Sequence, residues 1–451
     1  MSEGKLLRVV RRKEVFALAF GAMIGWSWVA LSGHWIANAG SLGAMLAFMV
    51  GGVAVIFVGF TYAELAAAMP LAGGEHVYSH RALGHSAAFV CTWSILLGYA
   101  SVVAFEAVAL PTVIEYLVPG IARGHLWTVA GWDVKLTWVL TGVIAAVLMT
   151  AVNILGIKPA ARLQLLVTVV ILIAGLALAG GSLLEGSASN MQPLFNHGAK
   201  GLLGVLVMVP FMFVGFDVIP QSAEEVDMPF REIGTTLMLS IIMAVIWYAI
   251  IIWAVSSGLD EAQRNASSLP TADAAVAVLG GTWAGKLLVI GGIGGILTSW
   301  NAFLIGGSRA IYAMAKAGQL PATFGRLHSR YNTPYNAILL IGSMSVIAPL
   351  FGRPAMVWLV DAGGLGIVVA YTFVALSFIV LRRREPDMER PYSVRYWRFT
   401  GFTALILSLA IAALYLPFSP AALVWPWEWG IVAGWALLGG VLLAFGRHTA
   451  D

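Results

Sequence analysis

The sequence PFMFVGFDVIP, residues 210–220, interrupts an apolar segment with two prolines, a glycine and an aspartate. Pro210 removes a helix hydrogen bond, and Gly215 loosens the backbone. Asp217 places a charge inside an apolar run, which is costly in a bilayer. The stretch therefore predicts a transmembrane helix that is broken near its middle.

A second stretch, GAMIGWSW at residues 21–28, carries the same kind of signal near the N-terminus. Gly21 and Gly25 each weaken a helix by about 1 kcal/mol. The two stretches lie in the first and sixth apolar segments, which indicates two inverted five-helix repeats. In such folds the unwound segments meet at the membrane midplane, where free N–H groups bind an anionic group and free C=O groups bind a cation. The alternative is that the glycines serve close helix packing.

The composition excludes a soluble protein. The 451 residues are 60% hydrophobic and only 11% charged, with a mean hydropathy of +0.87. Soluble proteins have about 45–50% apolar and about 25% charged residues. A single cysteine, Cys91, excludes an internal disulfide or a cysteine metal cluster. The uncharged stretch at residues 15–63 is too long for a signal-peptide core, so we expect a cytosolic N-terminal tail and no cleaved leader.

The apolar segments are of helical length. A hydrocarbon core about 30 Å thick needs about 20 apolar helical residues, and the segments do not alternate as membrane strands would. The sequence therefore predicts an all-α polytopic membrane protein with twelve transmembrane helices. Their expected positions are residues 16–38, 42–68, 82–117, 135–155, 160–184, 200–222, 234–257, 285–315, 335–352, 355–381, 399–417 and 425–446.

The distribution of basic residues predicts the orientation. With both termini in the cytoplasm, 20 of the 26 Lys and Arg fall in cytosolic segments and six fall on the opposite side. We expect one transmembrane domain over residues 1–451. It would consist of a first five-helix repeat at 1–184, a second, inverted repeat at 200–382, and two further helices at 399–446.

Five motifs, taken in order, resemble the amino acid–polyamine–organocation (APC) superfamily of permeases. The sixth span is especially similar to the cationic amino acid transporter branch. The resemblance implies a leucine-transporter-type fold of ten core helices plus two. The motifs are GAMIG in the first span, MPLAGGEHVYSHRALG (69–84), NILGIKPAARLQ (153–164), FVGFDVIPQSAEEVDMPFREIG (213–234) and SRAIYAMAKAGQLPATFGRLHSRYNTPYNA (308–337).

The resemblance also implies a substrate site at the two breaks. Backbone N–H groups of the first break would bind the substrate carboxylate, and carbonyl groups of the second would face its ammonium. The sequence departs from the family pattern G-x-I-G-x-G at Trp26 and Ser27. Either the indole of Trp26 narrows the pocket, or it packs against other helices or lipid. The implied residues are Ile24, Gly25, Trp26 and Ser27 for the carboxylate, and Phe211, Met212 and Val214 for the ammonium.

Glu106 lies deep in the apolar third span. An acid at mid-bilayer costs about 2.5–3.5 kcal/mol, so Glu106 should face a cavity and either carry a proton or pair with a cation. The alternative is a neutral carboxyl bonded to another helix. The resemblance places Glu106 at the substrate cavity, one turn from Val103, and Trp300 on the substrate path in span eight.

Asp217 occupies an acidic position of the resembled family after the sixth-span break. It is a candidate for linking substrate binding to gating through a carboxylate that takes up a proton. Its alternative role is a cap for the second half-helix. Glu64 and Asp361 lie near span ends, where we expect structural hydrogen-bond partners. A charged cluster at residues 224–232 should form salt bridges at the cytosolic side.

The coupling ion stays open between Na⁺, H⁺ and none. Many relatives carry a lysine in span five, but the corresponding residue is Ile171, so the lysine mechanism is absent. Thr298 and Ser299 resemble the hydroxyl pair that binds sodium in sodium-coupled members of the fold. With carbonyls of Gly21 and Ile24 they form a candidate Na⁺ site. Such hydroxyls often bond back to their own helix instead. For protons, the candidates are Glu106 and Asp217.

The resemblance implies a secondary active transporter that moves an amino acid or small organic amine across the plasma (inner) membrane by alternating access, coupled to Na⁺ or H⁺. The alternatives are an exchanger with no coupling ion and a transport-inactive membrane sensor that keeps the fold. No nucleophile elbow, zinc pair or phosphate loop points to an enzyme or an ATP-driven pump. Apart from a coupling Na⁺, we expect no cofactor. The expected partners are the small-molecule substrate and the lipid bilayer, with no nucleic acid.

Overall fold

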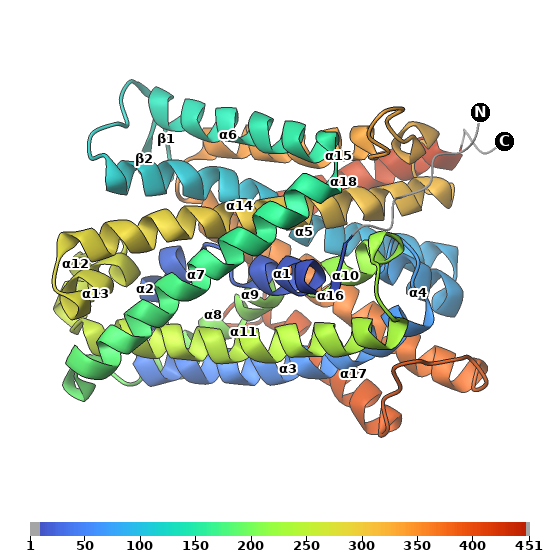
Figure 1. The fold of residues 1–451 in the computed structure, drawn as a ribbon, viewed down its shortest axis with the longest axis horizontal. Coiled ribbons are helices and arrows are strands. Elements are labelled where there is room, and N and C mark those ends of the chain that lie inside the picture. The colour runs from blue at the N-terminus through green and yellow to red at the C-terminus, as the bar shows by residue number, and fades with distance from the viewer. Residues whose placement is uncertain (1–9, 448–451) are drawn as a thin grey trace.

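The computed structural model describes residues 10–447, apart from the side chains of residues 157–164 and 446–447. The predicted cytosolic tail at residues 1–9 lies outside the described residues. So do the side chains of Lys158 and Arg162, which contribute to the predicted orientation. Figure 1 shows most long helices running side by side along the long axis of the molecule.

The first part of the chain forms seven helices and one hairpin. Its elements are α1 (Arg12–Met23), α2 (Ser27–Ala39), α3 (Ser41–Ala68), α4 (Glu75–Leu83), α5 (His85–Leu117), β1 (His125–Val129), β2 (Trp132–Lys135), α6 (Leu136–Leu155) and α7 (Ile157–Glu185). The two strands pair antiparallel, with Val129 opposite Trp132.

The second part of the chain is also helical, with short 3₁₀ turns between helices. Its elements are η1 (Ala188–Met191), α8 (Gly198–Leu206), α9 (Val209–Phe213), α10 (Val218–Gln221), η2 (Ala223–Glu225), α11 (Phe230–Gly258), α12 (Glu261–Ala266), α13 (Pro270–Leu279), α14 (Thr282–Lys316), η3 (Ala322–Gly325), α15 (Tyr335–Ile347), η4 (Ala348–Phe351), α16 (Ala355–Arg384), α17 (Trp397–Leu414) and α18 (Trp427–Arg447).

Eleven helical segments of the described chain are long and apolar enough to cross a membrane. They correspond to eleven of the twelve predicted spans. The remaining prediction, residues 335–352, corresponds to α15 and η4, which together form a shorter apolar helix, Tyr335–Phe351. The protein is therefore an all-α polytopic membrane protein.

The first and sixth spans are broken where the sequence predicts it. The helix of the first span stops at Met23 and resumes at Ser27. In the sixth span the helix ends at Phe213, and Val214 adopts an extended conformation. Gly215 has φ of 137°, a conformation that residues with a Cβ rarely adopt. The helical backbone resumes as α10 at Val218.

The broken helices lie at the centre of the bundle. In the most apolar window of α1–α2, 89% of residues are buried inside the protein, against 17% for α18. The intact helices α5 and α14 are buried to a similar extent as α1–α2. The core of the bundle therefore consists of α1–α2, α5, α8–α10 and α14, which other helices enclose. Helix α18 lies at its edge.

The two ends of the bundle carry different elements. The end that holds α4, the start of α1 and the end of α16 is called below the predicted cytoplasmic face, because the basic residues predict that location. The opposite face carries α12, α13 and the β1–β2 hairpin (Figure 1).

Ion pairs close several loops at the predicted cytoplasmic face. The carboxylate of Glu64 binds Arg382 and Arg390, which confirms its expected structural role. Within the charged cluster, Glu225 forms a buried pair with Arg309 of α14 at 2.9 Å. Removing one partner of such a buried pair would leave an uncompensated charge.

Candidate functional site

A small cavity lies where the two broken helices meet. Its volume is about 20 Å³, room for about one water molecule and far too little for an amino acid, so the structure is closed around it. Five elements and the first break contribute its walls. The lining residues are Ala22, Met23, Gly25, Ser27, Val102, Phe105, Glu106, Phe211, Met212, Ser299 and Phe303.

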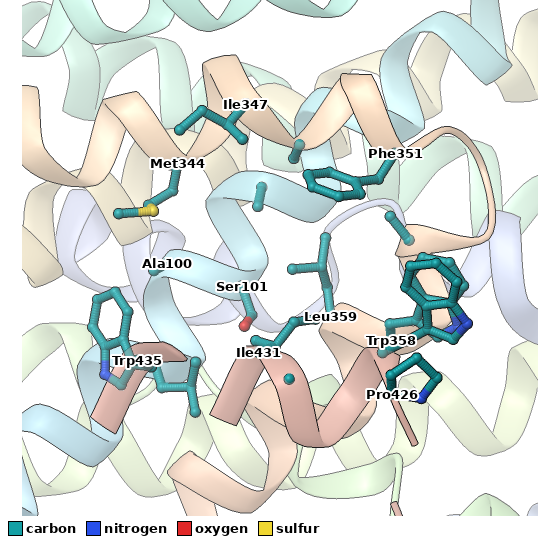
Figure 2. Close-up of a pocket in the computed structure, with 16 residues that line it drawn as sticks. Ala100, Ser101, Met344, Ile347, Phe351, Trp358, Leu359, Pro426, Ile431 and Trp435 are labelled. Atoms are coloured by element: carbon teal, nitrogen blue, oxygen red, sulfur yellow. The ribbon is translucent and has the colours of Figure 1, made fainter. Parts of the chain in front are cut away.

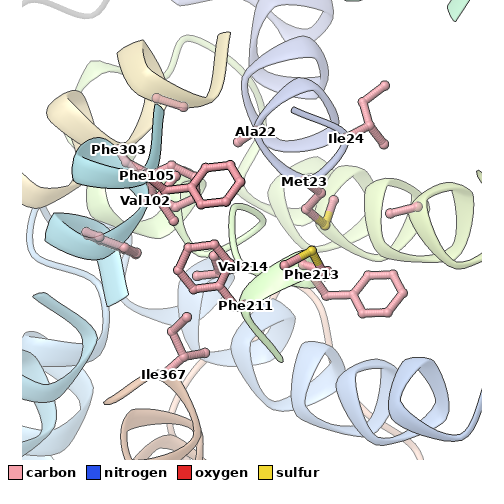
Figure 3. Packing of buried hydrophobic residues seen from close by; sticks show 14 of the residues in the cluster. Ala22, Met23, Ile24, Val102, Phe105, Phe211, Phe213, Val214, Phe303 and Ile367 are labelled. Atoms are coloured by element: carbon pink, nitrogen blue, oxygen red, sulfur yellow. The ribbon is translucent and has the colours of Figure 1, made fainter. Parts of the chain in front are cut away.

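Aromatic rings form much of the wall. Phe105 of α5 and Phe211 of α9 meet edge to face, with ring centroids 6.0 Å apart. Figure 3 shows both rings turned toward Ala22 at the end of α1, while the side chain of Ile24 points away from this group. Phe303 of α14 closes the same space. The cavity is therefore mostly apolar, with few polar groups that could orient a ligand.

Among the residues that line this cavity, Glu106 is the only one with an ionisable side chain. Its side chain is 2% exposed. The carboxyl oxygen Oε1 accepts a hydrogen bond from the hydroxyl of Ser299 on α14. In the part of the chain that the structure describes, Oε2 has no hydrogen-bond partner. The carboxyl is thus partly satisfied by a neighbouring helix and has one oxygen left for a proton or a ligand.

The Tyr248 hydroxyl on α11 ties the two breaks together. It lies 2.7 Å from the carbonyl oxygen of Met23 and 3.2 Å from that of Met212. It also lies 2.9 Å from the hydroxyl of Ser27. These carbonyls lie where the helices stop, so one phenol satisfies polar groups that the breaks leave free.

The first break packs closely against α14. A Cβ added at Gly292 would lie 1.9 Å from the indole ring of Trp26, so the ring fills the space that this glycine leaves. A Cβ at Gly295 would lie 2.6 Å from the carbonyl oxygen of Gly25. The indole of Trp26 therefore packs against a helix, which is one of the two alternatives that the sequence left open.

Both hydroxyls of the pair on α14 lie near a carbonyl of their own helix and near one partner outside it. Thr298 Oγ1 lies 3.2 Å from the carbonyl oxygen of Gly21 and 2.9 Å from that of Gly295 in its own helix. Ser299 Oγ lies 3.0 Å from the same Gly295 carbonyl oxygen and also reaches Glu106. Thr298 and Gly21, two of the candidate Na⁺ ligands, are thus neighbours. No group of three or more His, Cys, Asp and Glu among the described residues is arranged to hold a metal ion.

Asp217 lies outside the cavity, toward the predicted cytoplasmic face. It is fully buried. Its oxygen Oδ2 accepts a hydrogen bond from the hydroxyl of Tyr99 at 2.6 Å, and Oδ1 accepts one from the backbone N–H of Gly215 at 2.7 Å. Its side chain makes no capping bond to α10. Asp217 therefore connects the second break to α5.

The predicted site residues fall into two groups. Those that line the cavity are Gly25, Ser27, Glu106, Phe211, Met212 and Ser299. Those that are buried nearby without lining it are Gly21, Ile24, Trp26, Val103, Val214, Asp217, Thr298 and Trp300. On α5 the cavity is lined by Val102 and Phe105 next to Glu106, and Val103 lies beside that face. Whether any of these residues binds substrate or an ion stays a prediction.

Sequence reasoning missed Tyr248 and Tyr99. Both carry hydroxyls inside apolar spans that have few other polar groups. A buried phenol usually finds a hydrogen-bond partner. That signal marks them as polar contacts, but it does not say which helix they contact.

A larger cavity of about 460 Å³ lies elsewhere, between α5, α15, α16 and α18. Figure 2 shows it lined by aromatic and aliphatic side chains such as Phe351, Trp358 and Trp435, with Ser101 among the lining residues. It has no charged lining residue. Its chemistry differs from that of the cavity at the breaks, and no predicted site residue lines it.

Comparison with known proteins gives a consistent group of relatives. The chain matches the family described as amino acid permease over residues 12–441, a range that includes both broken helices. It is 26% identical over 397 residues to the branched-chain amino acid permease BcaP of Bacillus subtilis (strain 168), covering 86% of this chain and 84% of that protein. It is 25% identical over 430 residues to the aspartate-proton symporter of the same organism, covering 90% and 80%. It is 26% identical over 487 aligned positions to cationic amino acid transporter 4 of Homo sapiens, covering 99% and 74%.

Proposed function

We propose, from the premise that this chain belongs to the amino acid permease family, that it is a secondary active transporter of an amino acid or small organic amine. It would work by alternating access across the plasma membrane. Its relatives are transporters and not enzymes. The proposal includes the twelve-helix topology with cytoplasmic termini and the two inverted five-helix repeats, for which the breaks in the first and sixth spans are the support.

One observation carries the proposal: a closed cavity at the two helix breaks contains a single buried acid. Unwound backbone is tolerated at membrane depth only where it is buried in protein or lines a cavity. Here both breaks meet at the cavity that Glu106 lines. Because its volume is about 20 Å³, a substrate would need the walls to move apart. That requirement is the reason to propose alternating access for this chain.

The lining chemistry favours a neutral or cationic substrate. The relatives' names include branched-chain, acidic and cationic amino acids, so they do not select one class. No Lys or Arg lines the cavity, so an acidic substrate side chain would meet no positive partner there. The rings of Phe105, Phe211 and Phe303 suit an apolar side chain, and Glu106 suits an amine.

Glu106 is also the proposed carrier of the coupling proton. An ionised carboxylate with one unpartnered oxygen is costly in an apolar interior, so Glu106 would hold a proton in the closed state. The hydrogen bond that Ser299 donates favours the ionised form of Glu106, so burial has to outweigh it, and the same bond engages one of the two candidate Na⁺-binding hydroxyls. One relative is named a proton symporter.

Sodium is the second candidate for the coupling ion. The 3.2 Å distance between Thr298 Oγ1 and the carbonyl oxygen of Gly21 brings together two hard oxygen atoms of the kind that Na⁺ prefers. Because the Thr298 hydroxyl donates its proton to a carbonyl oxygen, its lone pairs stay available to a cation.

Uptake into proteoliposomes tests the function. The purified full-length protein would be offered radiolabelled leucine, lysine or aspartate, with or without an inward proton gradient and with Na⁺ replaced by K⁺. We expect saturable uptake of leucine or lysine that the proton gradient accelerates and the replacement of Na⁺ does not change. Uptake that requires Na⁺ would support the Thr298 site instead. Uptake only against preloaded amino acid would indicate an exchanger, and binding without uptake a sensor.

A further inference from the structure

Glu75 is a buried acid that the proposed mechanism does not use. It is the first residue of α4, at the predicted cytoplasmic face, and its side chain is fully buried. Among the described residues, neither carboxyl oxygen of Glu75 has a hydrogen-bond partner. It lies in the quoted motif MPLAGGEHVYSHRALG, where nothing in the sequence explains an acid. A buried carboxyl with no donor to either oxygen needs a physical explanation.

The surroundings of Glu75 contain further polar atoms without partners. The side-chain amide of Gln221, on α10, lies next to the Glu75 carboxyl. Neither amide atom has a partner in the described part of the chain, and the same holds for the hydroxyls of Tyr62, Tyr78 and Tyr371. The Tyr62 ring lies 6.5 Å from that of Tyr78 and 5.9 Å from that of Tyr371. Helices α3, α4, α10 and α16 thus enclose one polar cluster, called below the Glu75 cluster.

Asp217 is the second acid at the Glu75 cluster. It already accepts hydrogen bonds from Tyr99 and from the backbone of Gly215, which stabilise its charged form. Within the described chain, Glu75 makes no hydrogen bond of good geometry, and the groups beside its carboxyl that could donate are the Gln221 amide and its own backbone N–H. If only one of two neighbouring acids can ionise, the one with the better donors does so, and the other keeps its proton. Burial raises the pKa of Glu75 well above its ordinary value, and the nearby Asp217 adds to the effect.

The other titratable groups around Glu75 do not neutralise a negative charge. They are Tyr62 of α3, Tyr78 of α4, Cys91 and Tyr99 of α5, and Tyr371 of α16. The buried arginine of the neighbouring helix α14, Arg309, is bound to Glu225. Within the described residues, Glu75 therefore has no basic partner.

We propose that Glu75 is a second proton-binding site of this protein, separate from Glu106, and that loss of its proton opens the predicted cytoplasmic side. The two acids lie on different helices, Glu75 on α4 and Glu106 on α5. Tyr99 and Glu106 are seven residues apart on α5, which is about 10 Å along a helix. Glu75 is the first residue of α4, which lies at the predicted cytoplasmic end of the bundle (Figure 1).

The physical reason is the cost of a bare charge. A neutral Glu75 fits the closed Glu75 cluster, but among the described residues an ionised one would have no basic partner, no solvent and few donors beyond the Gln221 amide. Opening of α4 away from α10 and α16 would let water reach the carboxyl, so its ionised form stabilises the open state. The proton leaves to the water on that side. The open fraction should then rise up to about tenfold per pH unit while Glu75 is neutral in the closed state and ionised in the open state.

The native cysteine provides the measurement. Cys91 is the single cysteine of the chain and is fully buried, with its sulfur 3.8 Å from the carbonyl oxygen of Ala370 between α5 and α16. Opening of this region should expose it. The purified full-length protein would be labelled with N-ethylmaleimide between about pH 7 and about pH 9, above the ordinary pKa of histidine, so that the neighbouring His76 stays neutral throughout.

The result is read as the ratio of the wild-type rate to that of Glu75→Gln. A charge on Glu75 disfavours the nearby Cys91 thiolate and so works against a rise, which means that a rising ratio reports opening. We expect this ratio to rise up to about tenfold per pH unit. The matched control Glu75→Asp keeps a titrating carboxyl and should keep the rise. If Glu75→Gln does not fold, Glu75→Ala carries the same expectation.

A ratio that is constant across this range would overturn the inference, and so would a wild-type Cys91 that reacts at no pH. The inference builds on the proposed alternating access, but the labelling measures no transport. A rising ratio in a protein without amino acid uptake would therefore leave the Glu75 site standing and reject only the proposed function.

Discussion

The phenol of Tyr248 offers a direct test of how the two breaks are held. Its hydroxyl has one proton, which it donates to the carbonyl oxygen of Met23 at 2.7 Å or to that of Met212 at 3.2 Å. It also exchanges a hydrogen bond with Ser27 at 2.9 Å. Tyr248→Phe keeps the ring and its packing against Phe48 and removes only these contacts.

The expected loss follows from what stays behind. The carbonyl of Met23 would lose its donor in a buried setting, and a buried polar group left unsatisfied costs about 1–3 kcal/mol. Ser27 can turn to another acceptor, so its contribution should be smaller. We therefore expect Tyr248→Phe to lower the free energy of unfolding by about 1–3 kcal/mol.

A thermal-shift measurement in detergent checks this expectation, with the unfolding midpoint as readout. The matched control is Tyr396→Phe, because the side chain of Tyr396 lies in an exposed loop and is 68% exposed. An exposed hydroxyl should contribute close to nothing. Equal midpoints for the two variants would refute the view that Tyr248 holds the breaks together.

Three further predictions concern packing, charge and pH. Gly292→Ala should destabilise the protein by about 1–3 kcal/mol, because its Cβ would lie 1.9 Å from the ring of Trp26. Glu225→Gln should cost about 3–5 kcal/mol, because it leaves the charge of Arg309 buried without its partner. Burial lowers the pKa of His76 to about 4, so its contribution to stability is present above the ordinary histidine pKa of about 6.5 and is lost as pH falls toward about 4.

The same thermal assay covers these three predictions. Gly434→Ala serves as the control for Gly292→Ala, because no atom lies within 4 Å of a Cβ added there. For Glu225→Gln the control is Glu385→Gln, whose ion pair with Arg81 is largely exposed. His76→Gln should flatten the acid side of the stability profile. If His76→Gln leaves the acid side unchanged, the account of His76 is contradicted. If a variant and its control lower the unfolding midpoint equally, the account of that glycine or of that ion pair is contradicted.

The sequence predicts the architecture well because its signals are local. Prolines and glycines act on their own helix, so the breaks near Gly25 and Gly215 can be inferred from the printed residues. The depth of Glu106 in an apolar span likewise predicts that it faces something polar. Apolar length predicts each span to within a few residues, and only the segment Tyr335–Phe351 is shorter than a typical span.

The partners across helices could not be predicted in the same way. The bond from Ser299 to Glu106 joins residues 193 positions apart, and the bonds of Tyr248 join α11 to both breaks. Such contacts depend on how each helix is rotated about its own axis. A helix that is buried on all sides is apolar all round, so its sequence shows no single face that would fix this rotation. The packing of Trp26 had one usable signal, the glycine-rich run at residues 291–295, which leaves space on α14.

The central claim is that Glu106 carries a proton together with the substrate. The most direct measurement is the change in internal pH of proteoliposomes, reported by a trapped dye, when leucine or lysine is added outside. The account predicts internal acidification with the wild type and with Glu115→Gln, a matched change on the same helix outside the cavity. Glu106→Gln should give none. Acidification by Glu106→Gln at the wild-type rate would contradict the account.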